Sequence, residues 1–298
     1  MRVFVTGASG WIGSAVTAEL LATGHEVLGL ARSEDSAAAV AAAGAEVVRG
    51  DLDDPDGLAV VVEEVDAVVH LAFKHDSGDF AGARRSEAAA VRRMLDVFAF
   101  RDRPFLIASG LARASGGGVL TELDPSPHEG VGSARGGSEN LALSYADRGV
   151  RPVALRFAST VHEAGDPGLV AELVRIARER GVSGYLGDGA NRWTAVHRSD
   201  AAHLVRLALE KAPAGTRVHA VAEQGLRARD VATAIGAHLG VPVASIEPGD
   251  AAAHFGWIGG FVGVDARASN ARTRELLSWT PGGPTLFEDL AHGAHRWS

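Results

Sequence analysis

Three glycines at a fixed spacing constrain this chain more than any other feature. Gly7, Gly10 and Gly13 lie in VFVTGASGWIGSAV (3–16), directly after a short apolar run and at the start of a helical pattern. At this spacing, the first glycine permits a tight turn from strand to helix and the second lets the backbone approach a pyrophosphate. The third lets the helix pack closely on the sheet. Because the first N–H groups of a helix favour phosphate, the segment predicts a dinucleotide-binding turn.

Short apolar runs alternate with helical patterns through the first half of the chain. The runs are continuously apolar, as in strands that are buried on both faces. We expect strands at 2–6, 26–30, 46–49, 66–72, 104–109 and 152–157, and helices at 11–23, 33–43, 56–63, 81–101 and 134–148. This order predicts an α/β fold with a doubly wound, parallel sheet of the Rossmann type.

The pattern changes after Phe157. Helices are expected at about 167–180, 199–211 and 230–240, a late strand at 217–222, and a glycine-rich turn at 187–193. We expect a dinucleotide-binding domain made of residues 1–157 and about 190–213. A smaller, substrate-binding part would comprise about 158–189 and 214–298 and close over it.

Composition narrows the class of partner. The chain has 298 residues and a net charge of −8, with only 29 Lys and Arg, which disfavours nucleic acid and membrane surfaces. It has no cysteine, and no apolar run approaches the roughly 18 to 20 residues of a membrane helix. The N-terminal segment does not read as a signal peptide, and the twelve histidines show no metal-binding spacing. We expect a cytoplasmic protein that acts on a small molecule without a metal.

The glycine spacing resembles that of the short-chain dehydrogenase/reductase superfamily, in particular its extended, NAD-dependent epimerase/dehydratase-like branch. Further similar segments follow in order: GDL (50–52), HLA (70–72), LIASG (106–110), LRFASTVH (155–162), GDGANRWTAVHRSDAA (187–202) and RELLSWTP (274–281). The resemblance covers nearly the whole chain and implies a nicotinamide dinucleotide. The implied contacts to it are Gly7, Ser9, Gly10, Trp11, Ile12, Gly13, Asp51, Leu52, Leu71 and Ala72. Asp51 could instead cap the following helix.

The end of the second expected strand bears on the choice between NAD and NADP. Family members that select NAD usually have an acid there for the ribose hydroxyls, whereas this chain has Ala31 and Arg32. Arg32 can pair with a 2′-phosphate in a bidentate manner, and Ser33 can add a hydroxyl donor. Glu34 and Asp35 could oppose the phosphate. The segment favours NADP, with NAD as the alternative.

The resemblance also implies a catalytic serine, tyrosine and lysine. Ser109 lies in the serine place, where its hydroxyl could polarise a substrate carbonyl. Glu139 fits the glutamate that follows the lysine by four residues, which puts Arg135 in the lysine place and Val131 in the tyrosine place. Arg135 could hold the nicotinamide ribose, but its high pKa makes it a poor proton donor. Val131 cannot transfer a proton, so the catalytic tyrosine is missing.

Other residues could supply the proton. His75 follows the fourth expected strand, His128 precedes the valine, and His162 follows the sixth strand. Each of these histidines could instead have a structural or surface role. The aromatic residues Trp193, Phe255, Trp257 and Phe261 could line an apolar substrate pocket or pack in the core.

These observations favour an NADP-dependent oxidoreductase that reduces a carbonyl of a small or ring-bearing substrate, with Ser109, Arg135 and His75 as the catalytic residues. One alternative is a non-redox protein that binds or senses a dinucleotide. Another is an epimerase or dehydratase that retains its cofactor. By analogy with the family, helices 81–101 and 134–148 could form a homodimer contact.

Overall fold

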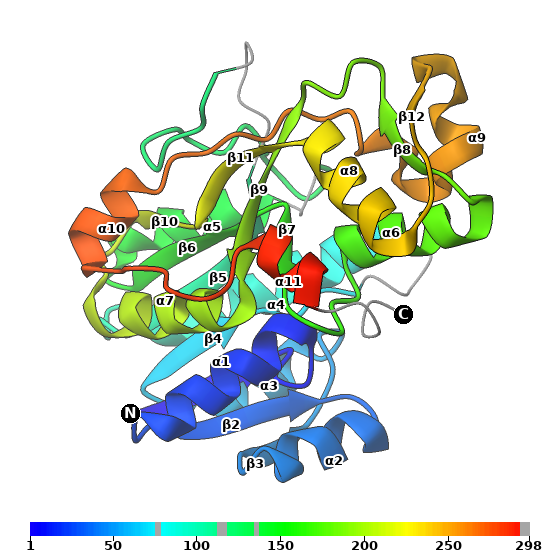
Figure 1. The fold of residues 1–298 in the computed structure, drawn as a ribbon. Helices are drawn as coiled ribbons and strands as arrows, with labels where there is room; N and C mark the ends of the chain where they lie inside the picture. The colour runs from blue at the N-terminus through cyan, green and yellow to red at the C-terminus, as the bar shows by residue number, and fades with distance from the viewer. Residues whose placement is uncertain (75–78, 112–117, 134–136, 293–298) are drawn as a thin grey trace.

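A seven-stranded parallel sheet forms the centre of the computed structural model, which describes residues 1–74, 79–111, 118–133 and 137–292 (Figure 1). The strand order is β10-β6-β5-β4-β1-β2-β3, and every neighbouring pair is parallel. The strands are β1 (Arg2–Thr6), β2 (Glu26–Ala31), β3 (Glu46–Arg49), β4 (Ala67–His70), β5 (Pro104–Gly110), β6 (Arg151–Phe157) and β10 (Thr216–Ala220). The predicted doubly wound, Rossmann-type sheet is confirmed.

Helices cover both faces of this sheet. Successive side chains of β1 point to opposite faces of the sheet, and both faces are apolar: Val3 and Val5 pack in one core cluster, and Phe4 packs in the other. The first cluster is formed with α1 (Trp11–Ala22), α2 (Glu34–Ala42) and α7 (Arg198–Lys211). The second is formed with α3 (Pro55–Glu63), α4 (Phe80–Phe98) and α5 (Ser138–Leu143). No helix in the described part of the chain is long and apolar enough to cross a membrane.

The helix expected at 134–148 is shorter in the structure. Its described part is α5, followed by the 3₁₀-helix η2 (Ser144–Arg148). Gly137 precedes α5 with φ +62°, and a Cβ there would lie 2.7 Å from the backbone nitrogen of Gly130. Glycine is therefore required at this turn because of both the backbone angle and the close approach.

A second region contains two small sheets, β11-β9-β7 and β12-β8. Figure 1 shows its helices α6, α8 and α9 together at the upper right, away from β2, β3 and α2. Its strands are β7 (Thr160–His162), β8 (Ser183–Leu186), β9 (Arg192–His197), β11 (Glu223–Arg227) and β12 (Val243–Ile246). Its helices are α6 (Leu169–Arg180), α8 (Ala228–Leu239), η3 (Pro248–Asp250), α9 (Ala251–Phe255), η4 (Gly256–Gly260) and α11 (Leu286–His292). The helix α10 (Ala271–Leu277) packs instead against α7 and β10 of the main sheet.

None of these five strands was expected from the sequence, and the reason lies in their pairing. β11 (EQGLR) has one apolar side chain, Leu226, which is paired with Trp193 of β9. The late strand expected at 217–222 is β10, and it extends the main sheet by pairing with β6. The main sheet therefore includes residues that the expected domain boundaries placed in the smaller part. The division into two parts stays a prediction.

A buried charge cluster ties the C-terminal helix to the second region. His162 of β7 is fully buried, and its Nδ1 lies 2.7 Å from Oδ2 of Asp289 in α11. Its Nε2 lies 3.6 Å from Oε2 of Glu223, which also accepts a hydrogen bond from the backbone of Leu286. Burial by itself lowers the pKa of His162, but the Glu223 and Asp289 carboxylates outweigh it and raise the pKa above the ordinary value.

We expect the His162→Gln substitution to destabilise the protein more at about pH 6 than at about pH 9. Because the folded pKa lies above the unfolded value of about 6.5, the stability that the charged ring contributes is complete below about pH 6.5. It is lost as the pH rises through the folded pKa. Urea unfolding at both pH values measures the effect, with His203→Gln on α7 as the control. An equal cost of His162→Gln at both pH values would contradict this account.

Candidate active site

A cavity of about 810 Å³ lies at the carboxyl ends of the central strands. It includes the point between β1 and β4 where the strand order reverses, which is where doubly wound sheets bind ligands. Twelve of the thirteen residues predicted to contact a cofactor line it: Gly7, Ser9, Gly10, Trp11, Ile12, Gly13, Arg32, Ser33, Asp51, Leu52, Leu71 and Ala72. The thirteenth, Arg135, lies outside the described residues.

The glycine turn leaves no room for a side chain at Gly7 or at Gly13. A Cβ at Gly13 would lie 1.9 Å from the carbonyl oxygen of Gly7, and a Cβ at Gly7 would lie 2.9 Å from the backbone nitrogen of Ala72. Gly7 also has φ +73°. These approaches bring the start of α1 against the turn after β1 and this turn against the segment after β4, so the first N–H groups of α1 lie at the cavity.

Trp11 joins the glycine turn to the second region. Its indole Nε1 donates to the carbonyl of Val161 in β7 at 2.7 Å. Arg198 lies over the Trp11 ring, 4.2 Å from the centroid, and donates to the Trp11 carbonyl and to Ser14 Oγ. Glu163 accepts from the same guanidinium at 2.8 Å. The loop of the glycine motif is therefore positioned by residues distant in the sequence.

Arg32 and Ser33 lie at the end of the cavity beside β2 and β3. Ser33 caps α2, where its Oγ accepts from the backbone nitrogen of Ser36, and Ser36 Oγ accepts in return from the backbone nitrogen of Ser33. Glu34, which could oppose a phosphate, forms an ion pair with Arg49. The pairing gives this carboxylate a positive partner outside the cavity lining.

Lys74 lines the cavity at the same end. Its Nζ lies 2.6 Å from Oδ1 of Asp51 and 2.6 Å from Oδ2 of Asp53. The hydrogen bond from Lys74 holds the pKa of Asp53 below its ordinary value. The alternative reading of Asp51 as a helix cap is wrong, because Asp54 caps α3 by accepting from the Gly57 backbone nitrogen.

The opposite end of the cavity, which we call the β6 end, has mostly apolar walls. It is lined by Ala108, Phe157, Ala158, Ser159, Thr160, Val161, Asp166, Pro167, Gly168, Leu169 and Trp257. Trp257 is exposed, and its indole Nε1 donates to Glu172 of α6 at 3.0 Å, while Phe261 packs edge-on against the ring. Of the four candidate aromatics only Trp257 lines the cavity, since Trp193 and Phe255 are buried in the core of the second region.

Asp166 was missed by the sequence analysis. It lies in a loop before α6, where Asp-Pro-Gly is typical of a turn, so nothing in the local pattern indicated a site. The structure buries it to 4% exposure in the wall of the cavity. Burial raises its pKa to about 6.

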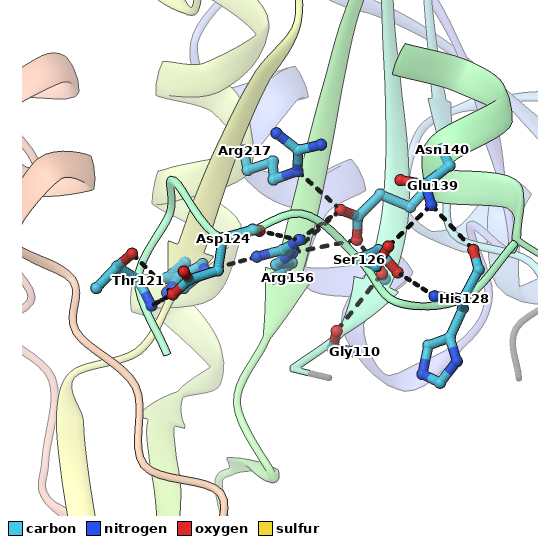
Figure 2. Close-up of polar contacts among 11 residues, drawn as sticks. Gly110, Thr121, Asp124, Ser126, His128, Glu139, Asn140, Arg156 and Arg217 are labelled. Atoms are coloured by element: carbon cyan, nitrogen blue, oxygen red, sulfur yellow. Dashed lines mark hydrogen bonds and ion pairs between the residues drawn. The ribbon is translucent and has the colours of Figure 1, made fainter. Parts of the chain in front are cut away.

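Ser109 belongs to a buried ionic network rather than to the cavity lining. Its Oγ donates to Oε2 of Glu139 at 2.7 Å. Arg156, with no exposed surface, donates to both oxygens of Glu139, and Arg217 donates to Oε1 at 3.1 Å (Figure 2). Burial opposes ionisation of Glu139, but its bonds to Arg156 and the other donors hold the pKa below its ordinary value.

Val131, the residue at the position expected for the tyrosine, cannot donate a proton. Val131 is 41% exposed. Nearby, the side-chain nitrogen of Asn140 donates hydrogen bonds to the backbone carbonyls of Ser126 and His128. The His128 ring points away from Glu139 in Figure 2. Like Arg135, His75 lies outside the described residues.

We expect the Arg156→Met substitution to lower the free energy of unfolding by about 3–5 kcal/mol, because it leaves the buried Glu139 carboxylate without its main partner. The double variant Glu139→Gln/Arg156→Met should lose less, since it removes both charges of the buried pair. Urea unfolding at neutral pH measures both variants. A double variant as unstable as the single one would show that packing, not the unpaired charge, sets the cost.

The chain is similar in sequence to known proteins over most or all of its length. An uncharacterized protein of Schizosaccharomyces pombe is 42% identical over 296 residues, which cover 99% of this chain and 100% of the relative. The 2-alkyl-3-oxoalkanoate reductase of Stenotrophomonas maltophilia is 28% identical over 228 residues, covering 70% of this chain and 66% of the reductase.

The fold is also similar to that of dTDP-glucose 4,6-dehydratase from Streptomyces venezuelae, solved with NAD bound. The TM-score is 0.78 at 23% identity, and the match covers 100% of this chain and 96% of the dehydratase. Residues 3–221 match the NAD dependent epimerase/dehydratase family. The chain therefore belongs to that family, in the extended branch of the short-chain dehydrogenase/reductase superfamily.

Proposed function

We propose that this protein is an NADP-dependent oxidoreductase that reduces a carbonyl group of a small or ring-bearing substrate. The observation that carries the proposal is the continuous cavity. It extends from Arg32 and Ser33, past the glycine turn, to the β6 end. This shape accommodates a dinucleotide along the sheet edge and a second molecule at the β6 end.

The residues of the cavity suit a dinucleotide. Asp51, Leu52 and Lys74 line the end of the cavity that would hold the adenosine. The glycine turn would present N–H groups to the pyrophosphate. The nicotinamide would then lie toward β5 and β6, and when bound in reduced form it supplies a hydride. Arg32 and the capped start of α2 suit a 2′-phosphate, because a guanidinium and a helix N-terminus both favour an anion.

The lining of the β6 end supports an uncharged substrate. Phe157, Leu169 and Trp257 are apolar or aromatic, and no basic side chain is among the described residues that line this end. A substrate with a phosphate or diphosphate would lack a cationic partner there. The 2-alkyl-3-oxoalkanoate reductase among the relatives is named for the reduction of a ketone. These points favour a carbonyl on an apolar framework.

The remaining roles stay predictions. Ser109 as the group that polarises the carbonyl, Arg135 as the ribose contact and His75 as a proton donor are such roles, and so are the homodimer and the cytoplasmic location. The hydrogen bond from Ser109 to Glu139 would have to break before the serine could donate to a substrate.

The proposed function can be tested by measuring whether the protein reduces any member of a panel of carbonyl compounds. Purified protein with NADPH and a set of aldehydes, ketones and α-diketones should consume NADPH, followed by its absorbance, and form one alcohol group per NADPH. Binding of NADPH without turnover of any member would contradict the reductase and favour the sensing alternative. A changed product without net NADPH consumption would favour the cofactor-retaining alternative.

We expect the Arg32→Ala substitution to raise the Kd for NADPH about 10- to 100-fold and to leave the Kd for NADH nearly unchanged. Charge-assisted hydrogen bonds of about 1.5–3 kcal/mol would be lost only with the phosphorylated ribose. Fluorescence titration measures both constants. Arg101→Ala is the control, because this exposed arginine precedes β5 and therefore lies at the amino ends of the strands, whereas the cavity lies at their carboxyl ends. Equal effects on NADPH and NADH would refute the assignment of Arg32.

A further inference from the structure

The ionisable side chains of the cavity are unevenly placed. Four are among its described lining residues: Arg32, Asp51, Lys74 and Asp166. Asp51 and Lys74 are paired with each other at the end beside β2 and β3, where Arg32 also lies. Asp166 is at the β6 end, where the substrate of the proposed function would bind. It is the one ionisable side chain among the described residues that line that end.

The contacts of Asp166 distinguish its two oxygens. Oδ1 accepts a hydrogen bond from the backbone nitrogen of Gly168 at 2.7 Å. Oδ2 accepts a longer and weaker hydrogen bond, 3.5 Å, from the hydroxyl of Thr160, which also lines the cavity. A backbone N–H can only donate, whereas the Thr160 hydroxyl can turn its hydrogen away, so we expect a proton on the carboxyl to reside on Oδ2. That oxygen can then donate to a substrate oxygen.

We propose that Asp166 is the catalytic acid that replaces the missing tyrosine, donating its proton from Oδ2 to the carbonyl oxygen of the substrate. This inference rests on the proposed function. The reduction adds a hydride to the carbonyl carbon and breaks the π bond, so the electron pair goes to the oxygen. The oxygen takes the proton of Asp166, and the resulting carboxylate regains a proton from water. In the reverse direction the carboxylate accepts the proton of the alcohol.

The electrostatic surroundings suit this role. Burial raises the pKa of Asp166 to about 6, although the Gly168 hydrogen bond and the charge of His162 act in the opposite direction. The other charged groups nearby are already paired: Asp289 and Glu223 lie against His162, and Glu163 accepts from Arg198. An acid with a pKa near the working pH transfers protons efficiently in both directions.

The first test needs no substrate. Carbon-13 NMR of protein labelled at the aspartate carboxyls should show one group that titrates at about pH 6, and this signal should vanish in Asp166→Asn. The asparagine keeps an oxygen for the Gly168 N–H, so the turn before α6 is retained. If the Asp166 signal titrates near the ordinary value of about 4, the inference fails whatever the protein's substrate is.

The second test compares matched variants on any carbonyl that the wild type reduces. We expect Asp166→Asn to lower kcat about 10²- to 10⁴-fold, with little change in the Kd for NADPH. The wild-type kcat should fall as the pH rises above about 6, and the residual rate of the variant should lack this dependence. Asp188→Asn is the control, because Asp188 makes the same type of contact to the backbone nitrogen of Ala190 but does not line the cavity.

The outcomes separate the two proposals. Wild-type turnover that survives in Asp166→Asn, or that requires His75 instead, overturns the assignment of Asp166 and leaves the proposed function intact. If the wild type reduces no carbonyl in the panel, the proposed function fails, and the catalytic role of Asp166 fails with it. Loss of NADPH binding together with turnover in Asp166→Asn also overturns the inference, because it indicates a structural role.

Discussion

The close packing of the glycine turn, in which Gly13 of α1 approaches Gly7 and Gly7 approaches Ala72, is the constraint on which the rest of the site depends. Only glycine fits at positions 7 and 13, where a Cβ would lie 2.9 Å or less from backbone atoms. The approach creates the cavity at the strand-order reversal and directs the first N–H groups of α1 into it. Trp11 connects this turn to β7, and Arg198 connects it to α7 and Glu163, so the glycine turn and the β6 end are held by one set of contacts.

A second constraint concerns the place of the family's catalytic residues. Glu139 collects hydrogen bonds from Ser109, Arg156 and Arg217 in a buried network. The serine proton is directed toward this carboxylate, and Val131 offers none. The charges of the network stabilise one another, whereas the effect of burial dominates at Asp166 in the β6 end and raises its pKa. The chemistry we propose therefore uses a group from the loop before α6 rather than from the helix that usually supplies it.

Much of the first half of the fold could be predicted from the sequence. The first six strands are apolar runs whose residues face both sides of the sheet, and the glycine spacing fixes the turn after β1. The second region was harder, because β7, β8, β9, β11 and β12 are short and several carry few apolar residues. Such strands exist because a partner strand satisfies their backbone groups. Leu226, for instance, lies in a strand only through its pairing with Trp193.

The sequence by itself determined the features that depend on local backbone geometry and periodicity: the glycine turn and the parallel sheet. Only the tertiary structure decided which polar groups are buried and what they face. It placed Ser109 against Glu139, paired Glu34 with Arg49 and put Asp166 in the cavity wall. The physical reason is that desolvation and charge pairing depend on neighbours that are distant in the sequence, so a residue's protonation behaviour is set by the fold and not by its local pattern.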